Sequence, residues 1–124
     1  MTLENLNKNY IYKTDQNQFG RVEYWQVMKP NDKGQYVGDC EDYCLTLQAK
    51  VDGYKDLELY YCHYNNVGHC IGKINGKWID CILQREVETL PPLYTDVRKY
   101  WLIEIWSKRL YGKVFRWLNK YLKK

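Results

Sequence analysis

Residues 67–80 read VGHCIGKINGKWID, and the Asn75-Gly76 pair inside this stretch decides how the middle of the chain folds. Apolar runs flank the pair on both sides. Asn-Gly between such runs favours a two-residue type I′ hairpin turn, because both central residues of that turn need a positive φ. If Ile74 pairs with Lys77, the pairs that follow are 73 with 78, 72 with 79 and so on along the two strands. The stretch therefore predicts an antiparallel hairpin with a fixed register.

This register predicts that a histidine and an acid lie close together. Pairing continues outward until His69 lies opposite Ile82, unless a bulge intervenes. Asp80 shares the face of Ile82 and lies diagonally across from His69, within about 7–8 Å at the backbone. We expect a hydrogen bond between imidazole and carboxylate. The same register places Cys70 opposite Cys81 on the other face, where both are expected to pack as small buried residues and where a disulfide can form under oxidation.

A candidate nucleophile lies upstream, in residues 38–43, which read GDCEDY. Asp39 is a favourable helix N-cap and Asp42 follows three residues later, so we expect a helix from Asp39 to about Gly53. Cys40 then lies in the first turn, where the partial positive charge and unpaired backbone amides favour a thiolate and can hold an oxyanion. The side chains expected on the buried face are Tyr43, Cys44, Leu47 and Val51.

Three carboxylates surround this cysteine and act in the opposite direction. Asp39, Glu41 and Asp42 place like charge beside the thiol, which raises its pKa. A protonated His69 or a bound cation would offset that effect. Oxygen-rich clusters suit calcium, whereas acids at a helix start usually serve as capping residues. The residues alone leave both roles open and favour capping.

Cys40, His69 and Asp80 together supply the nucleophile, the base and the orienting carboxylate that a cysteine hydrolase needs. His63 is a competing base, and it ranks below His69 because no acid is comparably placed beside it. A zinc site is a further alternative. It ranks low because the chain lacks a paired Cys-x-x-Cys spacing. The residues of that zinc site would be Cys40, Cys44, Cys62, His63, His69 and Cys70.

The remaining pattern predicts an α+β fold. Aromatic and β-branched residues gather at 57–64, 67–74, 77–83 and 99–106, and we expect these runs to form one antiparallel sheet. A further helix is expected before the turn at residues 30–34, since Phe19, Val22, Trp25 and Met28 recur at helical spacing. Residues 107–124 predict a C-terminal amphipathic helix docked on the core. Its apolar stripe consists of Leu110, Val114, Trp117, Leu118 and Tyr121.

Length and composition predict a single domain over residues 1–124. The chain has 124 residues, 45% of them hydrophobic, which is enough for one core and typical of a globular protein. No apolar run reaches the length of a membrane span, and no signal-peptide pattern opens the chain, so we expect a cytoplasmic protein. Five cysteines form no obvious disulfide framework, which suggests reduced thiols.

The positive charge is concentrated at the C-terminal end. Residues 96–124 contain nine Lys or Arg and two acids, which gives this segment +7, whereas the whole chain carries +4. Such a segment can meet an acidic partner, a lipid surface or nucleic acid, although a solvated helix face is the commoner explanation. If this segment binds a partner, we expect an acidic one, and we regard nucleic acid as unlikely.

Residues 25–83 resemble the bacterial transglutaminase-like cysteine proteinases, a branch of the transglutaminase and papain-like superfamily. The resemblance rests on Trp25 and on three blocks in order: GDCEDY at 38–43, VGHCI at 67–71 and WID at 78–80. It implies a papain-like fold, in which the helix that bears the nucleophile packs on an antiparallel sheet of about four strands.

The resemblance also implies roles for individual residues. Cys40 would be the nucleophile, His69 the general base and acid, and Asp80 the orienting group of a thiol protease that acts through an acyl-enzyme. Some relatives bind calcium through acids that flank the nucleophile, which by match are Asp39 and Glu41, with Asp42. The chain departs from the family in its short length, in the absence of an export signal and in its basic C-terminal helix.

The donors of the oxyanion hole are identified only in part. The Cys40 amide is one, and Gln26, Gln35 and Tyr36 are the candidates for a second. Two other functions stay open. A transglutaminase or deamidase would use the same three residues on a glutamine side chain. A catalytically silent protein of this fold would instead bind its partner through the basic C-terminal helix.

Overall fold

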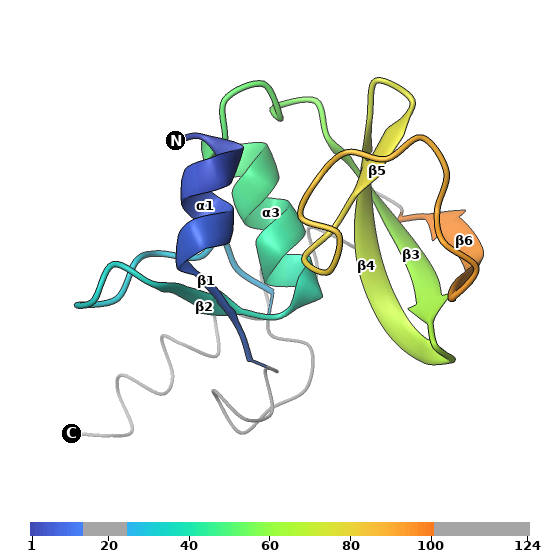
Figure 1. Cartoon of the computed structure of the whole chain (residues 1–124), viewed down its shortest axis with the longest axis horizontal. Helices are drawn as coiled ribbons and strands as arrows, with labels where there is room; N and C mark the ends of the chain where they lie inside the picture. Colours follow the sequence, from blue (N-terminus) through green and yellow to red (C-terminus); the bar gives the residue numbers. More distant parts are fainter. Residues whose placement is uncertain (14–24, 101–124) are drawn as a thin grey trace.

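The computed structural model describes residues 1–13 and 25–100 (Figure 1). The predicted α+β class is confirmed for this part of the chain, which contains two helices and six strands. The predicted C-terminal helix at 107–124 lies outside the described residues. In chain order the elements are α1 (Leu3–Asn9), β1 (Tyr10–Tyr12), β2 (Tyr36–Gly38), α3 (Cys40–Lys50), β3 (Glu58–Tyr64), β4 (Val67–Ile74), β5 (Lys77–Ile79) and β6 (Tyr94–Lys99).

Helix α3 begins where the sequence predicted. Asp39 is its N-cap, and a reciprocal capping box joins Asp39 and Asp42: each side chain accepts a hydrogen bond from the backbone N–H of the other. This arrangement satisfies amides that the first turn of a helix otherwise leaves unpaired. Cys40 is consequently the first residue of the helix. The helix ends at Lys50, and Val51 caps it.

The Asn75-Gly76 hairpin joins β4 and β5 in the predicted register. Ile74 pairs with Lys77, and both turn residues have positive φ, 52° for Asn75 and 75° for Gly76. Pairing extends only to Gly72 and Ile79, however, so the prediction of a strand through residue 83 is wrong. The chain turns at Asp80 because its carboxylate accepts backbone hydrogen bonds from the two residues at 82 and 83.

Four strands form one antiparallel sheet in the order β5-β4-β3-β6. The central pair is β3 and β4, in which Cys62 lies opposite His69. Strand β6 occupies one edge of the sheet, and its residues 94–98 were not predicted as a strand. Only Lys99 and Tyr100 of the predicted run at 99–106 can be compared, because residues 101–106 lie outside the described part.

A second, two-stranded sheet lies at the start of α3. Strand β1 pairs with β2 in parallel, with Tyr10 opposite Tyr36 and Tyr12 opposite Gly38. Helices α1 and α3 lie side by side, and the four-stranded sheet lies on the other side of α3 (Figure 1). The small sheet therefore fixes the N-terminal strand directly beside the segment that leads into Cys40.

The core is built around α3. Its buried side chains include Tyr43, Cys44 and Leu47, which belong to one cluster with Leu6 of α1 and Ile79 of β5. Residues 42–47 of α3 are all buried, so the helix is covered on more than one side, and this apolar contact provides most of its stability. The four residues whose burial was predicted for this helix are all buried.

Part of the predicted first helix is wrong. Trp25 and Met28 are buried, but residues 25–30 have no regular secondary structure, and Phe19 and Val22 lie outside the described residues. The backbone N–H of Met28 donates to Thr46 Oγ1 at 2.8 Å. Side chains of α3 thus satisfy amides of this segment that a helix would have paired internally.

Candidate active site

His69 and Asp80 form the predicted hydrogen bond. His69 lies on β4 and Asp80 directly follows β5, and the distance from Nε2 to Oδ2 is 2.7 Å. His69 is 7% exposed and Asp80 is fully buried. The contact forms although Asp80 has left the strand ladder, so the diagonal pairing from which it was predicted is not the geometry that produces it.

Asp80 is held by three further donors. Its Oδ1 accepts the backbone N–H groups of Ile82 at 3.1 Å and Leu83 at 2.7 Å, and its Oδ2 accepts the Tyr94 hydroxyl at 2.6 Å. Hydrogen bonds of this number stabilise an ionised carboxylate in a buried position. With His69 Nε2 as the hydrogen-bond donor to Asp80, Nδ1 is the nitrogen available to the cavity.

Two tyrosine rings surround the imidazole. The ring centroids of Tyr64 and Tyr94 lie 5.7 and 5.8 Å from that of His69, and the two tyrosines contact each other edge to face at 4.9 Å. Burial, followed by the hydrogen bond to Asp80, raises the pKa of Tyr94 far above its usual range. Tyr94 therefore remains a proton donor to Asp80 and restricts the movement of His69.

Cys40 faces the same space from the start of α3. Its thiol donates a hydrogen bond to Glu41 Oε2 at 3.0 Å, and its Sγ accepts the backbone N–H of Cys70 at 3.4 Å. Burial raises the pKa of the Cys40 thiol well above its usual range, and charge from Glu41, Cys81 and Asp39 raises it further. Burial is thus the main factor against the thiolate of the resting site, and Glu41 and Asp39 add to it in the direction that the sequence predicted.

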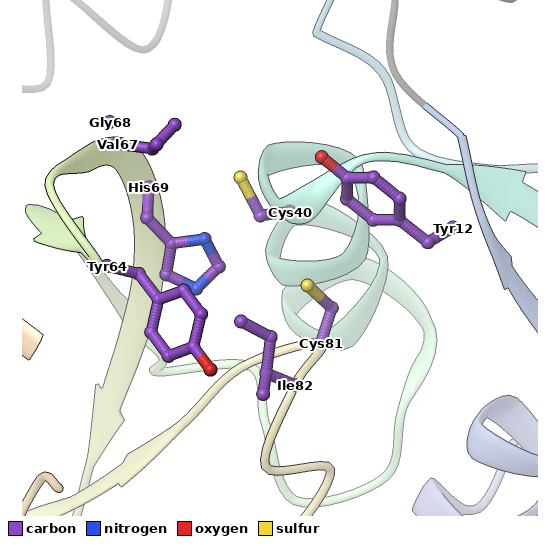
Figure 2. Close-up of a pocket in the computed structure, with 8 residues that line it drawn as sticks. All are labelled: Tyr12, Cys40, Tyr64, Val67, Gly68, His69, Cys81 and Ile82. Carbon is purple, nitrogen blue, oxygen red and sulfur yellow. The ribbon is translucent and has the colours of Figure 1, made fainter. Parts of the chain in front are cut away.

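A cavity of about 310 Å³ joins the nucleophile and the histidine (Figure 2). Figure 2 shows His69 on one side of Cys40 and Tyr12 on the other. The sequence missed Tyr12, because it lies outside every motif and is one of thirteen tyrosines. The residues that line the cavity are Tyr12, Cys40, Tyr64, Val67, Gly68, His69, Cys81 and Ile82.

The three acids around Cys40 have different partners. Asp42 is fully buried, and its oxygens accept the backbone N–H groups of Gln26 at 2.9 Å and Asp39 at 3.3 Å. Asp39 accepts the N–H of Asp42, so both acids serve the helix cap. In residues 1–13 and 25–100, no group of three or more His, Cys, Asp or Glu side chains is placed to hold a metal.

The predicted second oxyanion donors do not line the cavity. Gln35 closes the turn at residues 30–34, where it hydrogen-bonds with Asn31, and Tyr36 lies beside Lys50. The backbone N–H of Gln26 is engaged by Asp42. The structure thus brings together Cys40, His69 and Asp80, and none of the three candidates is among the described residues that line the cavity.

The alternative base and the zinc cluster have other environments. His63 was predicted to lack an acid, which is wrong: its Nδ1 lies 3.0 Å from Asp96 Oδ2 of β6. The pair is exposed, and His63 does not line the cavity. All five cysteines are unpaired and buried, including Cys70 and Cys81. Cys44 and Cys70 pack against each other through an Sγ to carbonyl contact of 3.9 Å.

No protein-family model matches this sequence, and no curated protein matches it. Within the described residues, no helix combines the length and the apolar character that crossing a bilayer requires.

Proposed function

We propose that the protein is a cysteine hydrolase that cleaves an amide bond of a protein or peptide. The observation that carries this proposal is the shared cavity, in which a helix-start cysteine faces a histidine whose far nitrogen is bonded to a buried, fully hydrogen-bonded Asp80. A nucleophile and a base that share one cavity, with an orienting acid bonded to the base, support a proposal of acyl transfer. A papain-like fold of the transglutaminase-like proteinase family is part of the proposal.

The reaction follows from the position of each group. His69 Nδ1 takes the proton of the Cys40 thiol, and Sγ attacks the carbonyl carbon, which forms an S–C bond and moves the carbonyl π pair onto oxygen. The oxyanion collapses, the C–N bond breaks, and the protonated imidazole donates its proton to the departing amine. Water then hydrolyses the thioester with His69 as the base. Asp80 holds the imidazole and stabilises its charged form.

The cavity favours an uncharged group next to the scissile bond. Among residues 1–13 and 25–100, none that lines the cavity is an Asp, Glu, Lys or Arg, and the lining residues Val67 and Ile82 are 67% and 45% exposed. Glu41 and Asp39 beside the thiol would repel a carboxylate on the substrate. We therefore expect cleavage next to apolar or neutral residues, which apolar burial would help to bind.

Selective alkylation tests whether the site is active. The full chain is treated with a limiting amount of iodoacetamide, and peptide mapping by mass spectrometry measures the rate at each cysteine. We expect Cys40 to react first and His69→Ala to lose this preference, because the imidazole generates the thiolate. His63→Ala is the matched control, since His63 lies outside the cavity. Equal labelling of all five cysteines would contradict an activated thiol.

A peptide library tests the reaction itself. Wild type and Cys40→Ala are incubated with a proteome-derived peptide mixture and methylamine, with calcium or with a chelator, and products are identified by mass spectrometry. New peptide termini that require Cys40 support proteolysis. Methylamidated or deamidated glutamine side chains without new termini would instead support the transglutaminase or deamidase alternative. Unchanged peptides under both conditions would leave the silent binding protein as the better explanation.

A further inference from the structure

We propose that Tyr12 supplies the second hydrogen-bond donor of the oxyanion hole, through its phenolic hydroxyl. This inference rests on the cysteine hydrolase function proposed above and names a residue that neither the motifs nor the resemblance contains. Tyr12 lines the cavity, and Figure 2 shows it extending from β1 with its hydroxyl end toward the Cys40 side.

Strand β1 fixes Tyr12 relative to the nucleophile. Tyr12 pairs with Gly38, two residues before Cys40, and the backbone N–H of Lys13 donates to the Gly38 carbonyl at 2.9 Å. The Tyr10 hydroxyl donates to the carbonyls of Gly38 at 2.9 Å and Asp39 at 3.3 Å. These bonds hold the strand against the segment that positions Cys40.

The arrangement places donors where negative charge develops. When Sγ attacks, the carbonyl oxygen becomes an oxyanion that needs hydrogen bonds on the side of Cys40 away from the leaving amine, which His69 protonates. The backbone N–H of Cys40, the first residue of α3, has no intrahelical acceptor and serves as one donor. Tyr12 approaches Cys40 from the side opposite His69 and serves as the other.

Tyr12 also has the right chemistry for this role. Burial of its hydroxyl end, together with charge from Cys40 and Asp39, raises the pKa of Tyr12 to about 12, so the phenol keeps its proton at neutral pH. The ring as a whole remains 57% exposed, which leaves room for a substrate carbonyl. Tyr64, the other hydroxyl-bearing residue among the described residues that line the cavity, lies beside His69 and therefore on the leaving-group side.

A peptide aldehyde separates oxyanion binding from thiol reactivity. The aldehyde forms a reversible S–C bond with Cys40, and its oxygen takes the place of the oxyanion; the matching peptide alcohol cannot add and is the control. The full chain and Tyr12→Phe are titrated with an N-acetylated dipeptide aldehyde, and protection of Cys40 from iodoacetamide gives the apparent Kd. Tyr36→Phe is the matched control, because Tyr36 pairs in the same small sheet but lies outside the cavity.

We expect Tyr12→Phe to keep the alkylation rate of Cys40 within about twofold and to weaken aldehyde binding by about tenfold or more, since one oxyanion donor contributes up to 10²–10³-fold to catalysis. Tyr36→Phe should leave both quantities unchanged. Preferential alkylation of Cys40 with equal aldehyde protection in wild type and Tyr12→Phe overturns the role of Tyr12 alone. A wild type without preferential alkylation overturns the hydrolase function, and the Tyr12 inference with it. A retained preference for Cys40 over the other four cysteines also shows that Tyr12→Phe is folded.

Discussion

Tyr94 donates its hydroxyl to Asp80 Oδ2 at 2.6 Å, and the same carboxylate oxygen accepts His69 Nε2 at 2.7 Å. The donor Tyr94 and the acceptor Asp80 come from opposite edges of the sheet: Tyr94 opens β6 at one edge, and Asp80 follows β5 at the other. Tyr94 therefore completes the hydrogen bonding of the base and its acid, although it lies in a part of the chain that contains no motif.

Replacing Tyr94 by Phe should weaken the positioning of His69 without abolishing reactivity. The variant keeps the ring but removes one of four hydrogen bonds to Asp80, and loss of a bond to a buried charged group costs about 1–3 kcal/mol. We expect a lower free energy of unfolding and a smaller fall in the Cys40 alkylation rate than in Asp80→Ala. Urea denaturation and alkylation kinetics measure the two effects. If Cys40 reacted as slowly in Tyr94→Phe as in Asp80→Ala, the other donors would not be sufficient to position the Asp80 carboxylate.

Replacing Glu41 by Gln should make Cys40 more reactive at neutral pH. Glu41 accepts the thiol proton and raises the pKa of Cys40 by its charge, so its neutralisation lowers that pKa toward the usual range. The pH profile of alkylation should shift to lower pH, although burial keeps part of the elevation. Glu88→Gln, a substitution at an exposed acid, is the control. An unmoved profile in Glu41→Gln would mean that its carboxylate does not govern the thiol.

Replacing Gly38 by Ala should disturb the start of α3. A Cβ at this position would lie 2.7 Å from Asp42 Oδ2 and 2.8 Å from Met28 Sδ, so the capping box or the core must shift. Overpacking of this kind costs about 1–3 kcal/mol. Gly72→Ala is the matched control, because its Cβ would crowd Leu57 at 2.7 Å but lies away from Cys40. Thermal unfolding should detect both variants, whereas slower Cys40 alkylation should be confined to Gly38→Ala.

Stability should decrease in alkaline solution. Burial raises the pKa of the Cys62 thiol from 9.0 to about 12, with a further contribution from Asp80. The unfolded chain therefore loses this proton at lower pH than the folded chain. The stabilisation is complete below pH 9 and is lost between pH 9 and 12, at up to about 1.4 kcal/mol per pH unit and thiol. In Cys62→Val, the slope of the unfolding free energy against pH should fall by the amount that corresponds to about one proton. An unaltered slope would exclude Cys62 as a source of the pH dependence.

Local signals predicted the parts of the site that lie within short stretches of chain. The capping box at Asp39 and the turn at Asn75-Gly76 each depend on residues a few positions apart, so their chemistry is visible in the sequence. Residues 25–30 were predicted wrongly because Trp25 and Met28 are buried by tertiary packing, with backbone amides satisfied by α3. Periodicity cannot distinguish such a segment from a helix.

The sequence by itself determined the helix that begins at Cys40 and the hairpin that carries His69, because both follow from propensity and spacing within a few residues. The contact between His69 and Asp80 was expected from a strand pairing that ends before Asp80. Only the tertiary structure decided what surrounds them. Asp80 meets Tyr94 of β6, and Cys40 shares a cavity with Tyr12 of β1, through strand pairings that join distant parts of the chain. Such long-range pairings depend on the packing of the whole domain around α3, which no local pattern encodes.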